Sequence, residues 1–349
     1  MSSAITAVTT EILADQSNPQ LLVHVKSDDG SSGVGETWWG TYQPLSEPGA
    51  PVRPIAAMID EVLGPLCIGW DSDDIKGLWE KLYRASYQYG PEGLVSTAIS
   101  GIDLALWDLV GRRRDLPVAD LLGSRCHDRI PAYASLHWLG TPELASRDAV
   151  DAVAAGFVGV KLHEAEVEVI LAVRDAIGPN VALMVDLSAR LEESTTVELS
   201  ADLKNADITW LEEPIFPYQD HSTLAKIRAS IPQRLAAGEN EFSSAGFERL
   251  LNAEAVDVVQ PDIVKAGGLT PARAISDLAS SKGAWLCPHN FSIGPSLGAN
   301  IHWAMTATAA KWIEVPFLSS GQSFPGSWAR PTLVDGSIPY PTEPGLGWG

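Results

Sequence analysis

The sequence predicts an α/β protein whose main part is a TIM-like β/α barrel, and two observations support this prediction. Short apolar runs end one after another on an acidic residue or a histidine, at Asp186, Glu212, Glu239, Asp262 and His289. These terminal residues are 23 to 27 positions apart, and steps of 25 extend the series back to Lys161 and forward to Glu314. A strand, a crossover helix and two turns need about 25 to 30 residues, and repeated parallel units of this kind close into a barrel.

Helical patterns fill the intervals between the predicted strands. They cover residues 142–155, 165–177, 195–205 and 270–282. The last begins with Thr270 and Pro271, a favourable N-cap and first-turn pair. The first barrel strand is expected at 133–136, with His137 at its tip. Because barrel enzymes collect their catalytic groups where the strands end, we expect the terminal residues to share one site.

An α+β domain is expected before the barrel, at residues 1–125. Three short strand patterns open it, and a long helical pattern follows over 55–122. The strands are expected at 5–13, 21–26 and 34–36. The barrel would then occupy 126–320, and the segment 321–349, rich in proline and glycine, would pack back onto the first domain.

An aromatic loop follows the third strand and contains Trp38, Trp39 and Tyr42. It is either a packed surface loop or a lid whose aromatic rings cover a substrate, since loops of both kinds are common. In the second case these three residues, together with His137, would line the pocket.

The composition narrows the possible functions. The 349 residues include 45% hydrophobic residues, enough for a large core, and the formal net charge is −20. Such a charge repels nucleic acids and anionic membranes, so neither is expected as a partner. The three cysteines are far apart, and the first residues lack a signal-peptide pattern. No run reaches the roughly 18 apolar residues needed to span a bilayer. We therefore expect a cytoplasmic protein.

Three carboxylates, Asp186, Glu212 and Glu239, end three successive strands. A ligand set made only of oxygen favours a hard cation, so the sequence predicts a Mg²⁺ site, with Mn²⁺ as the alternative. Each acid alone could simply stabilise the N-terminus of the following helix. Three acids in register on the catalytic face favour the metal. Strand alternation does not decide between Glu212 and its neighbour Glu213.

The remaining charged residues suggest proton transfer. Asp262 and His289 could form a carboxylate–imidazole pair, which would orient the ring and favour its protonated form. Lys161 and His163 are two residues apart, so their side chains point the same way on a strand. A lysine buried among barrel strands is expected to have a lowered pKa. Together with a cation, these groups suit the removal of the weakly acidic proton α to a carboxylate, through an enediolate.

Several motifs resemble the enolase superfamily, and specifically its mandelate racemase subgroup, over nearly the whole chain. They lie at residues 100–108, 116–118, 121–123, 210–214, 238–240, 261–268 and 288–289. The resemblance implies Mg²⁺ ligands at Asp186, Glu212 and Glu239, a general acid/base dyad of His289 and Asp262, and a Glu314 that hydrogen-bonds the metal-bound carboxylate. It also implies a capping domain whose loops near 14–20 and 37–54 set specificity, a structural Lys265, and a homo-oligomer.

Two departures from the family pattern bear on the reaction. The usual Lys-x-Lys is Lys161-Leu162-His163 here, and the usual Asp-x-Asn is Asp186-Leu187-Ser188. Racemisation with two bases suffers from the loss of the second lysine, whereas dehydration with His289 as both base and acid does not. The resemblance therefore favours a small carboxylate substrate, a sugar acid (aldonate or aldarate), and a dehydratase that forms a 2-keto-3-deoxy acid.

Each further group has an expected role in that reaction. Lys161 would neutralise the substrate carboxylate, and His163 would relay a proton or contact a hydroxyl. Ser188 and Asn240 would contact the substrate. The alternatives within this chemistry are a racemase or epimerase of a 2-hydroxy acid and a sugar-lactone cycloisomerase. Those of other classes are a metal-free Schiff-base aldolase that uses Lys161 and a non-catalytic binding protein for sugar acids.

Overall fold

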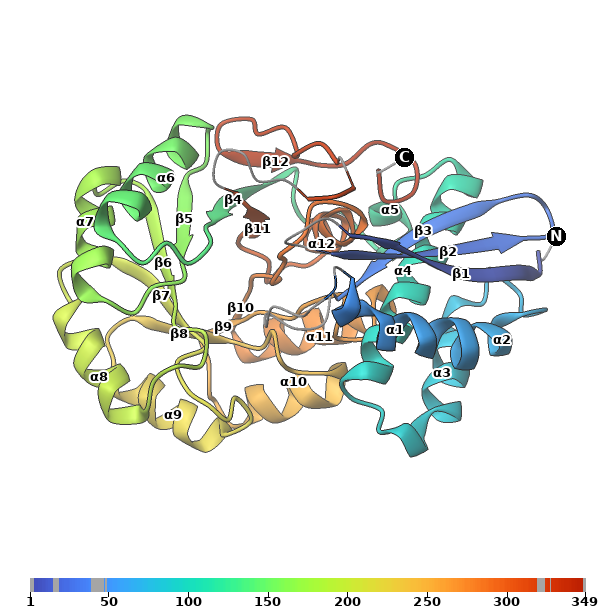
Figure 1. Ribbon diagram of the computed structural model, residues 1–349, viewed down its shortest axis with the longest axis horizontal. Helices are drawn as coiled ribbons and strands as arrows, with labels where there is room; N and C mark the ends of the chain where they lie inside the picture. The colour runs from blue at the N-terminus through green and yellow to red at the C-terminus, as the bar shows by residue number, and fades with distance from the viewer. Residues whose placement is uncertain are drawn as a thin grey trace.

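A curled parallel sheet ringed by helices lies beside a smaller α+β cap (Figure 1). The computed structural model describes residues 3–14, 19–38, 47, 49–318, 324–326 and 328–347. The predicted fold class, a β/α barrel with an N-terminal α+β domain, is confirmed.

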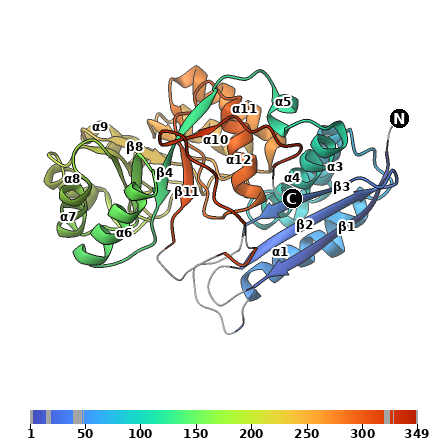
Figure 2. The same ribbon diagram turned by 90° about the horizontal axis from the view of Figure 1, so that it is seen from above.

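The cap begins with an antiparallel sheet of three strands, β1 (Ile5–Leu13), β2 (Gln20–Ser27) and β3 (Ser32–Thr37), close to the predicted ranges. A turn at Gly30, whose φ is 86°, joins β2 to β3. The helices that follow are η1 (Ala50–Val52), α1 (Arg53–Ala57), η2 (Met58–Leu63), α2 (Gly64–Cys67), α3 (Ile75–Ala85), η3 (Tyr87–Tyr89), α4 (Leu94–Arg114) and α5 (Val118–Leu122). Of these, α4, η2 and α2 pack against the sheet, on the side where Figure 2 shows the helices of the cap.

The central helix of the cap, α4, packs directly on β3. A Cβ at Gly35 would lie 2.2 Å from the carbonyl oxygen of Gly101, so this close approach requires glycine. α4 is long and apolar enough to span a bilayer, yet 89% of its most apolar window is buried inside the protein. It is therefore the core helix of the cap, which differs from the sequence expectation that no run is apolar enough to span.

Eight parallel strands and seven helices alternate in the described part of the barrel. The strands are β4 (Arg129–Ser135), β5 (Gly159–Leu162), β6 (Ala182–Asp186), β7 (Ile208–Glu212), β8 (Arg234–Ala237), β9 (Val258–Val259), β10 (Trp285–Leu286) and β11 (Ile313–Pro316). The helices are α6 (Pro142–Ala154), α7 (Val167–Ile177), α8 (Glu193–Asp202), α9 (His221–Ser230), α10 (Ser243–Asn252), α11 (Leu269–Lys282) and α12 (Pro295–Met305). Pairing runs from β10 through β4 to β11, and a parallel bridge between Leu286 and Ala310 joins the two ends.

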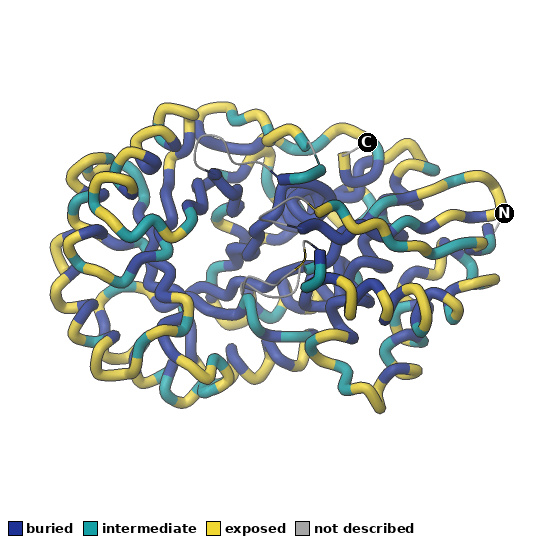
Figure 3. The backbone as a smooth tube through the Cα atoms, in the orientation of Figure 1, coloured by how far each residue is buried: buried dark blue, intermediate teal, exposed yellow. Residues whose placement is uncertain are grey.

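The barrel interior is filled by large side chains beneath the strand ends. Tyr133, Met184, Trp210 and Cys287 form a buried inner cluster, in which the rings of Tyr133 and Trp210 meet edge to face at 5.6 Å. A larger apolar core lies between the strands and the surrounding helices, and buried residues are concentrated along the strands and in α12 (Figure 3). The residues at the strand ends therefore lie directly above a layer of closely packed, buried side chains.

The C-terminal segment contacts both parts of the molecule. Its strand β12 (Ser337–Pro339) pairs antiparallel with β4 of the barrel. Farther on, Gly345 forms a parallel bridge with Pro117 of the cap, and the Leu346 amide donates to Asp108 of α4 at 2.8 Å. The expected contact with the first domain is thus accompanied by an equally direct contact with the barrel.

Candidate metal and proton-transfer site

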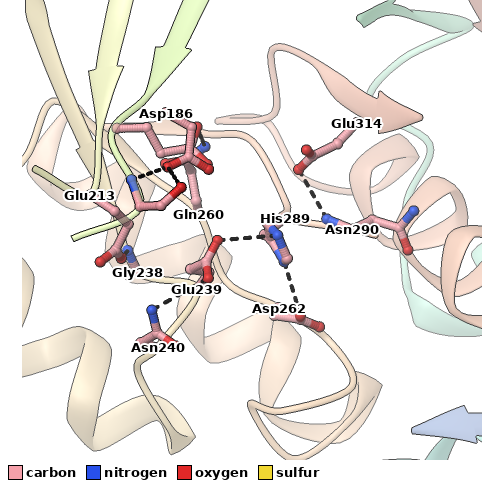
Figure 4. Close-up of polar contacts among 12 residues, drawn as sticks. Asp186, Glu213, Gly238, Glu239, Asn240, Gln260, Asp262, His289, Asn290 and Glu314 are labelled. Carbon is pink, nitrogen blue, oxygen red and sulfur yellow. Dashed lines mark hydrogen bonds and ion pairs between the residues drawn. The ribbon is translucent and has the colours of Figure 1, made fainter. Parts of the chain in front are cut away.

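Three carboxylates meet where β6, β7 and β8 end. Asp186, Glu212 and Glu239 each offer an oxygen within 4.8 Å of the others, and the first two are buried. Figure 4 labels Asp186 and Glu239 of this group. Glu213 is not part of this group: its φ is 42°, and its carboxylate accepts the amide of Gly238 at 3.0 Å. The donor set is entirely oxygen and fits a hard divalent cation such as Mg²⁺.

The acidity of these groups reflects the crowding of negative charge. Burial raises the pKa of Glu212 to about 7 and that of Glu213 to about 8, and neighbouring carboxylates add to both shifts. The pKa of Asp186 is lowered instead, because His163 and Lys161 outweigh the effect of its burial. A divalent cation among the three carboxylates would relieve their mutual repulsion.

Lys161 lies fully buried among the same carboxylates. Its Nζ is 2.5 Å from Oε1 of Glu212 and 2.8 Å from Oε1 of Glu314. Burial alone would lower its pKa, but these carboxylates raise the pKa of Lys161 well above its usual value. The expected lowered pKa is therefore wrong. A charged ammonium neutralises anions but does not supply the free amine that a Schiff base needs.

The predicted carboxylate–imidazole pair of Asp262 and His289 forms beside the carboxylate cluster. Nδ1 of His289 lies 2.9 Å from Oδ2 of Asp262, and its Nε2 lies 3.1 Å from Oε2 of Glu239 (Figure 4). Burial would lower the pKa of His289, yet Glu239, Glu314 and Asp262 together raise it to about 10. A cation on Glu239 would offset part of that increase. The Nε2 atom thus faces the carboxylate cluster, while Asp262 holds the other side of the ring.

The second candidate base, His163, has both ring nitrogens engaged. Nδ1 contacts the carbonyl oxygen of Leu136, and Nε2 lies 3.1 Å from Oδ2 of Asp186. Its ring also contacts Phe291, which packs edge to face on His137 at 4.9 Å. Nε2 of His137 is buried without a hydrogen-bond partner among the described residues, and burial lowers the pKa of this histidine. His137 is therefore a neutral ring with an unused polar atom.

The residues predicted to contact the substrate do not form one group in the structure. Ser188 donates from its amide to Oδ1 of Asp186 at 2.6 Å and therefore holds a carboxylate of the cluster. Asn240 donates to Glu239 at 3.3 Å and accepts from Lys265 at 2.9 Å. The ring of Trp38 lies 6.1 Å from that of His289 and beneath Nζ of Lys265 at 4.6 Å. Trp39 and Tyr42 lie outside the described residues.

Sequence reasoning missed several residues that support these groups. Oε2 of Glu212 accepts from Gln260 at 2.6 Å and from the Trp210 indole at 2.9 Å. Glu314 accepts the amide of Asn290 at 3.0 Å (Figure 4). Gln260 directly precedes the strand end at Pro261 and Asp262, and Asn290 directly follows His289. Both residues could have been found from the sequence, because each is adjacent to a predicted strand end.

A barrel with an α+β cap and an acidic cluster on its catalytic face defines a barrel enzyme. The family described as Enolase C-terminal domain-like matches residues 145–349, and the Mandelate racemase / muconate lactonizing enzyme, N-terminal domain, matches residues 3–123. The chain therefore belongs to the enolase superfamily, within the mandelate racemase and muconate lactonizing enzyme group, as its motifs predicted. It is an enzyme.

The similar proteins within this family act on acid sugars, according to their names. D-galactarolactone cycloisomerase of Agrobacterium fabrum is 32% identical, over 94% of this chain and 88% of that protein. L-rhamnonate dehydratase of Saccharopolyspora erythraea is 30% identical, over 94% and 82%. The crystal structure of 3,6-anhydro-D-galactonate cycloisomerase from Zobellia galactanivorans has a TM-score of 0.89 at 28% identity, over 99% and 96%. The relatives thus include acid-sugar dehydratases and cycloisomerases.

Proposed function

We propose that the protein is a Mg²⁺-dependent dehydratase that converts an aldonate or aldarate into a 2-keto-3-deoxy acid. The observation that carries the proposal is that the two histidines differ in what holds the outer side of the ring. Nε2 of each histidine lies 3.1 Å from a carboxylate of the cluster. Nδ1 of His289 is held by the carboxylate of Asp262, which supports a base, whereas Nδ1 of His163 contacts only the backbone carbonyl of Leu136. A single base suits an elimination, in which the proton taken from carbon can be returned to the leaving oxygen.

Asp186, Glu212 and Glu239 would hold Mg²⁺, which supplies positive charge to stabilise the anion formed when the α-proton leaves. His289 removes that proton through Nε2, while Asp262 accepts from Nδ1 and fixes the ring. Lys161 offsets the negative charge of the substrate carboxylate. Glu314 holds Lys161 in place and accepts the amide of Asn290 next to the base.

The elimination balances with no other reactant. The Cα–H bond breaks to His289 and the Cβ–O bond breaks to the leaving hydroxyl, which takes the proton from the imidazolium and departs as water. The new carbon–carbon double bond is an enol that becomes the 2-keto acid. The net change is the loss of one water, and Nε2 of His289 serves as base and then as acid.

A cycloisomerase is the second candidate, and two similar proteins carry that name. It would use the same first step and the same base. The leaving oxygen would then be part of a sugar ring and would stay attached to the product, so the mass would not change. The two candidates therefore differ only in the oxygen that receives the proton.

Proton NMR in D₂O, combined with mass spectrometry of a parallel reaction in H₂O, separates these outcomes. The Mg²⁺-loaded protein would be incubated with aldonates, aldarates, their lactones and anhydro acids, and simple 2-hydroxy acids. A 2-keto-3-deoxy product that is lighter by one water supports the dehydratase, and a ring-opened product of unchanged mass supports the cycloisomerase. Deuterium at the α-carbon without elimination would contradict both and indicate an epimerase.

Two histidine variants sharpen that experiment. His289→Asn should abolish product formation while Mg²⁺ binding remains. His221→Asn is the matched control, because His221 also contacts a carboxylate, Glu241 at 2.7 Å, but lies on α9. Equal loss in both variants would mean that unfolding, not the missing base, explains the effect.

A further inference from the structure

The segment that carries the base, residues 289–296, runs from shortly after β10 into the first turn of α12 and is held through Asn290. The Asn290 amide donates to Glu314, and its side chain donates to the Ser292 carbonyl at 2.7 Å. Its Oδ1 accepts from the Ser296 hydroxyl at 3.1 Å. The positions of Ser292 and Ser296 therefore determine where Asn290 and the adjacent His289 lie.

Glu36, at the end of β3 in the cap, binds both serines. Its Oε1 accepts from the Ser292 hydroxyl and from Gln20 Nε2 at 2.9 Å, and its Oε2 accepts the Ser296 amide at 3.0 Å. The residue is only 2% exposed. Its three neighbours all donate, so Glu36 acts as an acceptor at both oxygens. Burial raises the pKa of Glu36, and these hydrogen bonds oppose that rise.

Glu36 also caps α12, which has no side-chain cap of its own. The first amides of a helix lack partners within the helix, and a negative charge there is favourable. Room for this carboxylate depends on Gly294, whose φ is 152° and whose hypothetical Cβ would lie 3.0 Å from Oε2 of Glu36. A residue of the cap thus completes the start of a barrel helix.

The surroundings of Glu36 leave it little freedom. The neighbouring Gly35 packs against the backbone of α4, which ties β3 to the core of the cap. Gln20 adds a second connection, since its Nε2 donates to the Ile293 carbonyl at 3.0 Å and its Oε1 accepts the Gly326 amide at 3.0 Å. The cap and the C-terminal segment therefore converge on the strand-to-helix segment that follows His289.

We propose that Glu36 is a positioning residue for the general base. By accepting from Ser292 and Ser296 it sets the path of residues 289–296, so docking of the cap completes the proton-transfer site. This inference rests on the proposed function of His289 and assigns the cap a role that acts through the barrel segment.

Two substitutions test the inference, and a third is the matched control. Glu36→Gln places an NH₂ group against at least one donor, and Ser292→Ala removes the hydroxyl but leaves Glu36 intact. The control is Asp108→Asn. Asp108 is a buried carboxylate of the cap that accepts the amides of Val34 at 2.9 Å and Leu346 at 2.8 Å, and these contacts lie outside residues 289–296.

The first readout needs no substrate. Hydrogen–deuterium exchange followed by mass spectrometry should show amides 289–296 exchanging roughly 10-fold faster in Glu36→Gln and Ser292→Ala. The same amides should be unchanged in Asp108→Asn. Unchanged exchange in the two test variants would overturn the proposal, even if the protein turned over none of the sugar acids. The exchange experiment therefore tests the role of Glu36 independently of whether the protein is a dehydratase.

The second readout is kinetic. In Glu36→Gln we expect kcat to fall about 10- to 100-fold, because small displacements of a reacting group are costly. KM and the affinity for Mg²⁺ should change less than about twofold. The double variant Glu36→Gln/Ser292→Ala should lose little more kcat than Glu36→Gln alone, since the Ser292 hydroxyl acts through its contact with Glu36. Retained kcat, or an equal loss in Asp108→Asn at the same melting temperature, would contradict the proposal.

Discussion

The carboxylate cluster and the dyad lie side by side, yet they are held by different parts of the molecule. Barrel residues alone support the cluster in the described structure: Ser188 binds Asp186, while Gln260 and Trp210 bind Glu212. Cap residues support both halves of the dyad. On the Asp262 side, Ser96 donates to the Lys265 carbonyl at 2.5 Å, and Ser100 accepts the Gly267 amide at 2.9 Å.

On the His289 side, Glu36 and Gln20 hold the following segment. On the proposed function, this difference teaches that cation binding and proton transfer have separate structural requirements. Barrel residues hold the three carboxylates, whereas contacts from the cap hold the segments beside Asp262 and His289. The following predictions test that division.

The largest effect is expected from Glu212→Gln, which breaks the cluster and leaves the cap untouched. Activity should fall by at least about 10³-fold, because the cation site loses a ligand and Lys161 loses its shortest ion pair. Calorimetric titration with Mg²⁺ should show the loss of binding. Glu241→Gln is the control, since that buried acid lies outside the cluster. Full Mg²⁺ affinity in Glu212→Gln would refute the ligand assignment.

Acid should weaken the joint between cap and barrel at His302 of α12. Its Nδ1 accepts the Ala119 amide of α5 at 2.9 Å, and burial lowers its pKa to about 4 despite the opposing charge of Asp120. The folded state therefore binds fewer protons than the unfolded chain between pH 6.5 and 4. Stability from this group is complete above pH 6.5 and is lost as the pH falls toward 4, by up to about 3 kcal/mol.

Denaturant unfolding across this pH range measures that loss. His302→Asn should be less stable at neutral pH but should show a flatter decline on acidification than the wild type. His24→Asn is the control, since His24 lies in the exposed part of the cap sheet beside Glu11. Identical slopes in wild type and His302→Asn would show that other groups cause the acid sensitivity.

Cation binding should stabilise the barrel without requiring the dyad. At a Mg²⁺ concentration about 100 times the Kd, linkage gives about 2.7 kcal/mol of added stability. The melting temperature should rise with Mg²⁺ in the wild type and in His289→Asn, and EDTA should reverse the rise. An increase that survives Glu212→Gln would place the bound cation elsewhere.

The smallest effect is expected from Ser100→Ala, which removes one contact between α4 and the Asp262 side. Loss of a single hydrogen bond to the Gly267 amide should cost about 1 kcal/mol of stability, and kcat should fall only a few-fold. Ser276→Ala, a buried serine of α11 that contacts neither half of the dyad, provides the comparison. An unchanged kcat in Ser100→Ala would show that the cap positions only His289 and not Asp262.

Much of the site was predictable because parallel strands end on one face. The spacing of the terminal residues predicted the grouping of Asp186 and Glu239 with a glutamate at 212 or 213, and the pairing of His289 with Asp262. The spacing did not predict the protonation state of Lys161. Its pKa depends on carboxylates brought from β7 and β11, whose distances from Nζ are set only when the ring closes.

The sequence by itself determined the barrel, the cap and the set of ionisable groups, because periodicity and strand-end chemistry are local properties. Tertiary structure decided which glutamate joins the cluster, that both nitrogens of His163 are engaged, and that Glu36 reaches Ser296 across 260 positions of sequence. Such contacts arise when separate elements pack, and their energies depend on burial and distance, which no local pattern specifies.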